Sequence, residues 1–373
     1  MSVFSILDQI GTCELHVLFD HATGLRAVVG LHDTRLGPAI GGTRMWQYGS
    51  DDEALLDVAR LARAMTAKAA LAGLAHGGGK AIIWADPANP PSDRRVLFEA
   101  FGRFVDRLGG RYLTCEDSGT STADMDIVRG VTPHVLGVSA ERGGSGDPSP
   151  FTALGVRRGI EACAELVLGR ASLAGLHVAV QGVGAVGRHL AHELAAAGCR
   201  LTITDVNRER ATRVAEELGA AVVLPDEIFD VECDLFAPCA LGGAVSDATV
   251  NRLRCRVVAG AANNQLASRE IGRVLHARGI FYAPDYAINA GGLINVAEEF
   301  RGYDAERARE KTLAIRETIA EIARRSLRGD GPPAEIADHM VEDRLARAGA
   351  QPLPSTAAIL ASPASSRARG SAV

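Results

Sequence analysis

The feature that most constrains the fold of this chain is a glycine-spaced turn near its middle. The residues Gly182-Val183-Gly184-Ala185-Val186-Gly187 follow the apolar run 177–181 and open a segment of helical spacing. Between a strand and a helix, the first glycine permits a tight turn, the second lets a pyrophosphate approach the backbone, and the third lets the two elements pack closely. We therefore expect a dinucleotide to bind at Gly182, Gly184, Val186 and Gly187. A glycine-rich turn without a ligand is the alternative.

A carboxylate at the end of the next apolar run indicates which dinucleotide this would be. Asp205 closes the run 201–205 and lies 23 residues after Gly182. In dinucleotide-binding folds an acidic residue at this place accepts hydrogen bonds from the adenosine ribose hydroxyls and repels a 2′-phosphate. The sequence therefore predicts NAD rather than NADP as the cofactor.

The alternation of apolar runs and helical segments from 177 to 285 is typical of a doubly wound parallel sheet. The length of 373 residues suggests two domains. Turn-forming residues gather at 143–150 and mark the boundary. We expect an α/β fold with an N-terminal α/β domain over 1–145 and a Rossmann-type domain over 146–330. A helical segment at 331–350 and a disordered tail at 351–373 should follow.

The N-terminal half predicts a mixed set of elements. Strands are expected at 15–19 and 25–31 as a hairpin, and at 81–84 and 112–115. Helices are expected from 50 to about 70, 94–108, 152–167 and 304–328, and a proline-rich loop at 87–91.

Composition excludes several classes of protein. The net charge is only −5 and 47% of the residues are hydrophobic, so no basic surface for nucleic acid is expected. No apolar run reaches the roughly 18 residues that a membrane span needs, and the first residues lack the layout of a signal peptide. Seven cysteines form no C-x-x-C pair, which argues against disulfides and a structural metal. We expect a cytoplasmic protein without a bound metal.

Lysine is rare enough to direct attention to individual positions. Of 40 basic residues only Lys68, Lys80 and Lys311 are lysine, and two of these lie around the glycine-rich stretch at 77–79. A buried lysine, unlike arginine, can lose its proton near neutral pH. Lys68 could instead extend its apolar stem along a helix, and Lys80 could be a solvated strand end. We expect Lys80 at a loop-to-strand junction, poised as a general base.

Asp117 follows the expected strand 112–115. Local sequence is equally compatible with a helix cap or a turn residue there. The lysines that could pair with its carboxylate favour a functional role.

The chain resembles the leucine, valine and phenylalanine dehydrogenases, within the amino-acid dehydrogenase superfamily that includes glutamate dehydrogenase. The resemblance spans about residues 10 to 345. Seven blocks carry it in the same order: LGPAIGGTRMW at 36–46, MTAK at 65–68, GGGK at 77–80, EDSGT at 116–120, APCALG at 237–242, AANNQ at 261–265 and YAPDY at 282–286.

The resemblance implies an NAD-dependent, reversible oxidative deamination of an L-amino acid to a 2-oxo acid and ammonia. By position, Lys68 matches the clamp for the substrate carboxylate, assisted by backbone groups near Gly41 and by Asn264. Lys80 matches the base that activates water, and Asp117 matches the carboxylate that carries protons to and from the substrate amine.

The resemblance also assigns positions around the cofactor and the domains. Thr152 and the turn at Ala240 and Leu241 match positions that flank the nicotinamide, and Asn263 matches a position on the cofactor side. It implies that the domain at 1–145 binds substrate and mediates assembly into a homo-oligomer, with the active site in a cleft between the domains.

The side-chain pocket expected from the resemblance is apolar, and its lining residues are Ile40, Met65, Cys115, Leu293 and Val296. Glutamate-specific relatives have a lysine in place of Ile40 and a serine in place of Val296, so a glutamate substrate is disfavoured. A branched aliphatic substrate such as leucine, valine or isoleucine is expected. The chain departs from leucine-type members at Cys115, Ser118 and Leu293. The choice between leucine and valine as the preferred substrate therefore stays open.

Three other interpretations remain. An aromatic substrate such as phenylalanine is the alternative within the same class. A nucleotide-binding protein without activity is the alternative outside it, against which Lys68, Lys80 and Asp117 count. A lysine and an aspartate also serve shikimate-type dehydrogenases, which lack the GGGK block and the context of Asn263 and Asn264.

Overall fold

The computed structural model describes residues 2–11, 14–85 and 93–349. The chain divides into two compact units, each discontinuous in sequence. The first unit comprises Met1–Gly146, Val296–Arg307 and Asp343–Val373, and the second comprises Asp147–Asn295 and Ala308–Glu342. The expected domain bounds at 145, 330 and 350 stay predictions.

The first unit is built on a five-stranded mixed sheet with the order β1-β2-β4-β3-β5. Its strands are β1 (Glu14–Asp20), β2 (Leu25–Asp33), β3 (Ala39–Trp46), β4 (Gly77–Trp84) and β5 (Tyr112–Glu116). β1 and β2 form the predicted antiparallel hairpin, whereas β3 pairs in parallel with both β4 and β5. The sequence does not indicate β3, because its glycines at 41 and 42 interrupt the apolar pattern.

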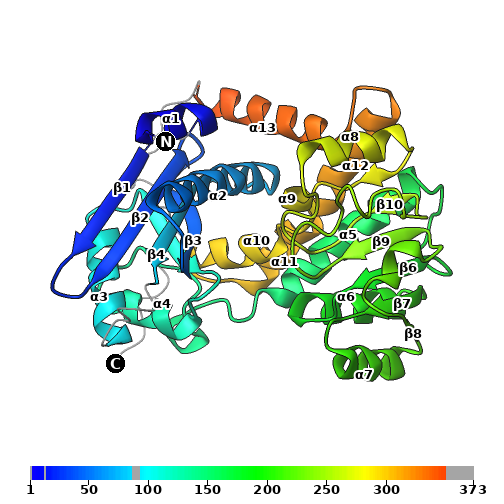
Figure 1. Cartoon of the computed structure of the whole chain (residues 1–373), viewed down its shortest axis with the longest axis horizontal. Coiled ribbons are helices and arrows are strands. Elements are labelled where there is room, and N and C mark those ends of the chain that lie inside the picture. The colour runs from blue at the N-terminus through cyan, green and yellow to red at the C-terminus, as the bar shows by residue number, and fades with distance from the viewer. Residues whose placement is uncertain (1, 12–13, 86–92, 350–373) are drawn as a thin grey trace, which may run out of the picture. The chain divides into compact units, whose positions relative to one another are not determined.

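Helices cover both faces of this sheet, and Figure 1 shows α2 against one of them. The helical elements are α1 (Val3–Ile10), α2 (Asp51–Leu71), α3 (Arg94–Asp106), α4 (Thr122–Arg129), η1 (Ala140–Arg142) and η3 (Glu298–Arg301). The predicted helix from residue 50 is confirmed, since the Ser50 hydroxyl caps α2 by accepting from the Glu53 amide.

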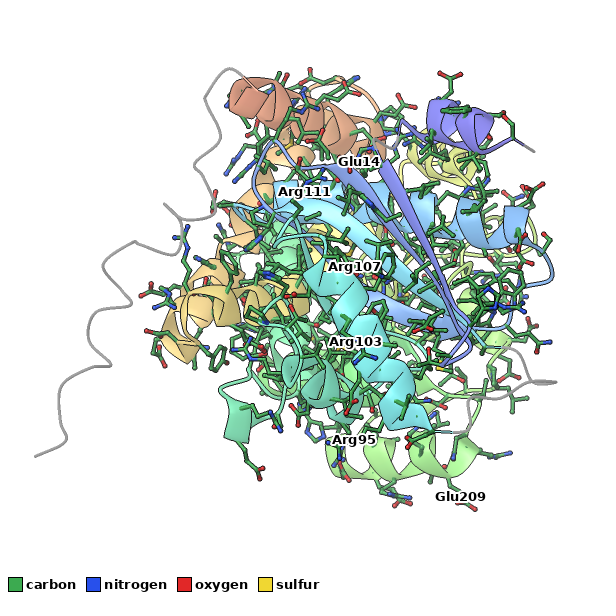
Figure 2. The ribbon with its side chains drawn as sticks, turned by 90° about the vertical axis from the view of Figure 1, so that its left-hand side faces the viewer. Glu14, Arg95, Arg103, Arg107, Arg111 and Glu209 are labelled. Carbon is green, nitrogen blue, oxygen red and sulfur yellow. The ribbon has the colours of Figure 1, made fainter. Side chains whose placement is uncertain are left out.

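Alternation along the strands decides which helix each side chain meets. On β2, Leu25, Ala27 and Val29 pack with Phe98 and Phe101 of α3, while Val28 packs on the opposite face with α2. In Figure 2, α3 crosses the sheet with Arg95, Arg103 and Arg107 along it, and Glu14 lies beside Arg111, with which it forms an ion pair.

The glycines at 77–79 belong to β4, which corrects the expectation that they form a loop and that Lys80 lies at its junction with a strand. They serve close packing instead of a turn. A Cβ on Gly78 would lie 2.0 Å from the amide nitrogen of Thr66, and one on Gly79 would lie 2.8 Å from the ring of Tyr112. Only glycine allows α2 to approach the sheet here.

The second unit contains a six-stranded parallel sheet with the order β11-β10-β9-β6-β7-β8. The strands are β6 (His177–Gln181), β7 (Arg200–Thr204), β8 (Ala221–Val222), β9 (Leu235–Pro238), β10 (Val257–Val258) and β11 (Phe281–Tyr282). Counted from β6, this is the 3-2-1-4-5-6 order of the Rossmann fold, with the change of direction between β6 and β9. The predicted doubly wound sheet is confirmed, and Figure 1 shows its strands among α5, α6 and α7.

The remaining helices follow the predicted pattern with small shifts. They are α5 (Ser149–Leu166), α6 (Ala185–Ala196), α7 (Arg208–Leu218), η2 (Glu227–Asp230), α8 (Arg269–Ala277), α9 (Asp285–Ile288), α10 (Gly291–Ala297), α11 (Ala305–Leu313), α12 (Ile315–Leu327) and α13 (Pro333–Gly349). The helix expected at 304–328 is divided into α11 and α12. The expected loop at 87–91 and the tail at 351–373 lie outside the described residues.

The packing at Gly78 yields a stability prediction. Gly78→Ala should lower the free energy of unfolding by about 1 to 3 kcal/mol, because the new methyl group meets backbone atoms that cannot turn away. Gly49→Ala is the control, since its methyl group would meet only the flexible Glu53 side chain at 3.1 Å. Urea unfolding followed by circular dichroism measures both, and equal midpoints would contradict the close approach.

Candidate active site

The first unit brings Lys80 and Asp117 together. Lys80 lies on β4 on the same face as Ile82, which α2 covers, and only 6% of the residue is exposed. Asp117 directly follows β5, and its Oδ2 lies 2.8 Å from Lys80 Nζ. The two most important predicted residues, 37 positions apart in the sequence, therefore form a half-buried ion pair.

Glycines on β3 make room for this pair. A Cβ on Gly42 would lie 2.8 Å from the Cβ of Asp117, and one on Gly41 would lie 1.8 Å from the carbonyl oxygen of Gly79. The Gly41 carbonyl accepts a 2.5 Å hydrogen bond from the Tyr112 hydroxyl. The backbone around the expected carboxylate site is thus fixed from both sides of β3.

Three side chains that the sequence analysis did not single out extend the pair into a network. Arg44 Nε donates to Asp117 Oδ2 at 3.1 Å, and Arg44 Nη1 donates to Asp57 Oδ2 at the same distance. The Tyr48 hydroxyl donates to Asp57 Oδ2 at 2.8 Å. The sequence holds one signal for Arg44, because it lies two residues after Gly42 and therefore on the same face of a strand as Gly42. This signal can be used only once β3 is recognised as a strand.

Opposing effects act on the Asp117 carboxyl. Burial raises its pKa, but the charge and hydrogen bond of Lys80 and the charge of Arg44 lower the pKa more, and the net result lies below the usual value. Asp117 is therefore an anion at neutral pH. Burial lowers the pKa of the Arg44 guanidinium, but the charges of Asp117 and Asp57 and the hydrogen bond to Asp117 raise this pKa more. The net result lies above the usual value.

The predicted pocket residues of the first unit lie on β3, α2, β5 and α10. Ile40 is fully buried, and Met65 and Val296 are half-buried. Burial raises the pKa of the Cys115 thiol to about 12, so this side chain is a neutral thiol. Lys68 lies in the last turn of α2 and is half-buried.

The glycine turn of the second unit has the geometry that a dinucleotide needs. Gly182 has a φ of 91° and approaches Ala240, whose backbone nitrogen would lie 3.0 Å from an added Cβ. A Cβ on Gly187 would lie 2.0 Å from the Gly182 carbonyl oxygen, whereas one on Gly184 would meet open space. Gly182 thus makes the turn, Gly184 leaves the approach open, and Gly187 allows close packing. This arrangement fits a pyrophosphate. Val186 is half-buried in the first turn of α6.

Asp205 follows β7 and is joined to the same turn. Its side chain accepts from the Val183 amide at 2.9 Å and from the Asn207 amide at 2.8 Å, and it also pairs with Arg210. Burial raises the pKa of Asp205, but the Arg210 hydrogen bond and the two amides lower it further than burial raises it. The carboxylate is ionised and already accepts hydrogen bonds from these three residues. The sequence did not indicate these hydrogen bonds.

Of the other predicted cofactor residues of the second unit, Ala240 lies against Gly182 of this turn. The Gly243 amide donates to the Asn264 carbonyl at 2.7 Å, which joins the segment after Ala240 and Leu241 to the segment of Asn263 and Asn264. Leu241 is 88% exposed. Thr152 lies on α5, and its hydroxyl oxygen would lie 2.6 Å from a Cβ added to Gly292, the residue before Leu293.

Two further residues hold Asn263 and Asn264. The buried Asn289 donates through Nδ2 to Asn263 Oδ1 at 2.9 Å and to the Ala261 carbonyl at 3.1 Å. Asp285 accepts from the Asn264 amide, and Asn264 has a φ of 50°. Nothing in the sequence pattern singles out Asn289, although its side-chain amide donates the hydrogen bonds that fix this segment.

Comparison with known proteins identifies the family. Residues 9–134 match the model described as the Glu/Leu/Phe/Val dehydrogenase dimerisation domain, and residues 202–311 match the Glutamate/Leucine/Phenylalanine/Valine dehydrogenase model. The chain belongs to this family of amino-acid dehydrogenases.

Curated relatives and a solved structure agree with this assignment. Leucine dehydrogenase of Geobacillus stearothermophilus is 51% identical over 92% of this chain and 94% of its own length. Valine dehydrogenase of Streptomyces coelicolor is 45% identical over 92% of this chain and 95% of its own. The crystal structure of L-tryptophan dehydrogenase from Nostoc punctiforme has a TM-score of 0.83 at 37% identity and covers 93% of this chain and 100% of that one.

The described part of this dehydrogenase shows neither a metal-binding cluster nor a membrane-spanning helix. Within residues 2–11, 14–85 and 93–349, no three histidine, cysteine, aspartate or glutamate side chains are grouped as metal ligands would be. Over the same residues, no helix combines the length and the apolar character that a membrane span requires.

The network predicts how activity depends on pH. Arg44→Gln removes one of two cations beside Asp117, so the pKa of this carboxyl should rise toward its usual value. As pH falls, the variant should lose kcat/KM at a higher pH than the wild type, because Asp117 becomes protonated earlier. Arg60→Gln, which removes an exposed charge from α2, is the control. If kcat/KM fell at the same acidic pH in the wild type and in both variants, the role of Arg44 would be contradicted.

Proposed function

We propose that this dehydrogenase catalyses the NAD-dependent, reversible oxidative deamination of a branched-chain aliphatic L-amino acid. The products are the 2-oxo acid, ammonium, NADH and a proton, and one water is consumed. The observation that carries the proposal is the Lys80–Asp117 pair at 2.8 Å, in a family whose members act on amino acids. A base and a proton carrier in direct contact suit a reaction that must activate water and release an amine.

The residues divide this chemistry as follows. Lys68, the backbone near Gly41 and Asn264 hold the substrate carboxylate. When bound, NAD accepts the hydride from the substrate Cα. Lys80 first passes its own proton to Asp117, and its neutral amine then takes the proton from the water that attacks the resulting iminium carbon. Asp117, now protonated, delivers its proton to the departing amine. Because Lys80 and Asp117 are in hydrogen-bond contact, the proton passes between them without crossing bulk water.

The cofactor side is assigned to the second unit. The turn of Gly182, Gly184, Val186 and Gly187 would hold the pyrophosphate, and Asp205 would accept from the adenosine ribose. Thr152, Ala240, Leu241 and Asn263 would hold the nicotinamide. NAD is favoured over NADP because Asp205 carries a full negative charge.

Apolar pocket residues support a branched aliphatic substrate. Ile40, Met65, Leu293 and Val296 carry no polar side-chain group that could pair with a carboxylate, and Cys115 is a neutral thiol. Burying a branched side chain against such residues contributes about 1.5 to 3 kcal/mol. A second carboxylate, as in glutamate, would lose its hydration without a counter-charge from these residues.

An aromatic substrate is the second candidate. It is favoured by the likeness to the tryptophan dehydrogenase, whose whole length this chain matches. The higher identity to leucine and valine dehydrogenases favours the aliphatic candidate.

We further propose that the protein is a cytoplasmic homo-oligomer. The assembly is supported by the family model that matches residues 9–134, which describes a dimerisation domain.

The proposed base is tested by two substitutions at one position. Lys80→Ala should lower kcat by about 10²- to 10⁴-fold, the usual contribution of a general base. Lys80→Arg should not restore it, because a guanidinium keeps its proton near neutral pH. NADH absorbance gives the rates and NADH fluorescence gives cofactor affinity, which should persist. Appreciable turnover by Lys80→Arg would refute the assignment.

The substrate is tested with a panel of L-amino acids. Leucine, valine and isoleucine should all react, with kcat/KM values spread over about 10- to 200-fold, because one methylene contributes little discrimination. Phenylalanine should be poorer than the best of them. Ile40→Ala should shift the preference toward longer or aromatic side chains.

The control for Ile40→Ala is Ile82→Ala. Ile82 is 1% exposed on the same face of the sheet, so both variants lose the same buried volume. Only the Ile40 variant should change the order of substrates. A wild type that prefers phenylalanine or tryptophan would establish the aromatic candidate instead.

A further inference from the structure

The carboxylate of Asp205 has no lone pair left for a ribose while Arg210 remains in place. Oδ1 accepts from the Asn207 amide at 2.8 Å and from Arg210 Nη2 at 2.6 Å. Oδ2 accepts from the Val183 amide at 2.9 Å and from Arg210 Nε at 3.1 Å. A carboxylate offers about four acceptor sites, and these four donors fill them.

The four donors differ in how easily they can leave. Val183 and Asn207 donate from the backbone, which is fixed by the glycine turn and by the start of α7. The Arg210 side chain is 45% exposed and can rotate into solvent, whereas the Asp205 side chain is only 4% exposed. A ribose hydroxyl can therefore reach Asp205 by displacing Arg210 and no other donor.

The position of Arg210 on α7 makes its pairing with Asp205 informative. Arg210 lies in the first turn of this helix, where its backbone amide is capped by Asn207. The helix dipole disfavours a cation at this end and favours an anion. Arg210 is thus held there by Asp205 against the field of its own helix, at a place where a phosphate would be attracted.

We propose that Arg210 is a second determinant of cofactor choice, which competes with the ribose of NAD for Asp205 and pairs with the 2′-phosphate of NADP. The inference rests on the proposed binding of the dinucleotide at the glycine turn. Once displaced, the guanidinium lies beside the ribose and offers two parallel donors to a phosphate. The negative charge of Asp205 is offset by the same residue. The enzyme therefore accepts NADP more readily than the carboxylate alone would allow.

Binding measurements test this without relying on turnover. Fluorescence titration of the full-length protein gives dissociation constants for NADH and NADPH. Arg210→Gln should raise the ratio of NADPH to NADH dissociation constants by roughly 10- to 150-fold, because two charge-assisted hydrogen bonds to the phosphate are lost. NADH itself should bind more tightly, because its competitor is gone.

The matched control is Arg208→Gln. Arg208 is an exposed arginine at the first position of the same helix, so this variant loses the same charge two residues away. It should move the ratio by less than about threefold, since exposed charges interact weakly. Equal ratios in the two variants would mean that only the overall charge matters and would overturn the inference.

A double substitution separates Arg210 from Asp205. Asp205→Ser should tighten NADPH binding, because Arg210 is released and no carboxylate remains to repel the phosphate. Adding Arg210→Gln should abolish that gain. A gain that persists in the double variant would overturn the inference.

Failure of the inference and failure of the proposed function have different signatures. If the wild type binds NADH and oxidises leucine while Arg210→Gln leaves the ratio unchanged, only the inference fails. If the wild type binds neither NADH nor NADPH, the proposed function fails together with it.

Discussion

The absence of side chains at a few positions of β3 and β4 is the constraint on which the first unit depends. Gly78 lets α2 reach the sheet, Gly41 lets β3 reach Gly79, and Gly42 leaves room for Asp117. Each contact would bring an added Cβ within 3 Å of a backbone or side-chain atom. Backbone that packs this closely has little freedom to shift, so the side chains attached to it are held in fixed positions.

The charges in this region are tolerable because they balance one another. A single buried ion costs far more free energy than packing can return, unless a partner and hydrogen bonds compensate. Asp117 lies between Lys80 and Arg44, and Arg44 in turn meets Asp57. The pairing is thus shared over two strands and a helix. Sharing allows one member to exchange a proton while the others still neutralise the remaining charge.

The sequence predicted the second unit better than the first for a physical reason. The G-x-G-x-x-G turn, the parallel strands and Asp205 are a local pattern, and each part of it is visible in one continuous segment. The sheet of the first unit joins β3, β4 and β5 from separate parts of the chain. Its glycines interrupt the apolar period because they pack against other backbone. The sequence therefore does not predict β3 and places the start of β4 too late.

The candidate site shows the same division. Lys80 and Asp117 could be singled out because lysine is rare and because the surrounding blocks resemble a family. Arg44 could not, since its place on the same face as Gly42 is visible only once β3 is recognised. Asn289 could not, since a lone asparagine carries no pattern. Their roles appear only from the contacts that they make with Asp117 and Asn263. Arg210 is a similar case, because its partner lies five residues away across a turn.

The scarcity of lysine has a practical consequence for chemical modification of the protein. Reagents that acylate amines meet three lysines in the whole chain: Lys80 is 6% exposed, Lys68 is half-buried and Lys311 is exposed on α11. Among these lysines, attachment to an amine-reactive support or dye will therefore fall mainly on Lys311. Coupling at this small number of positions gives a nearly uniform orientation, and the arginine-rich surface remains unmodified.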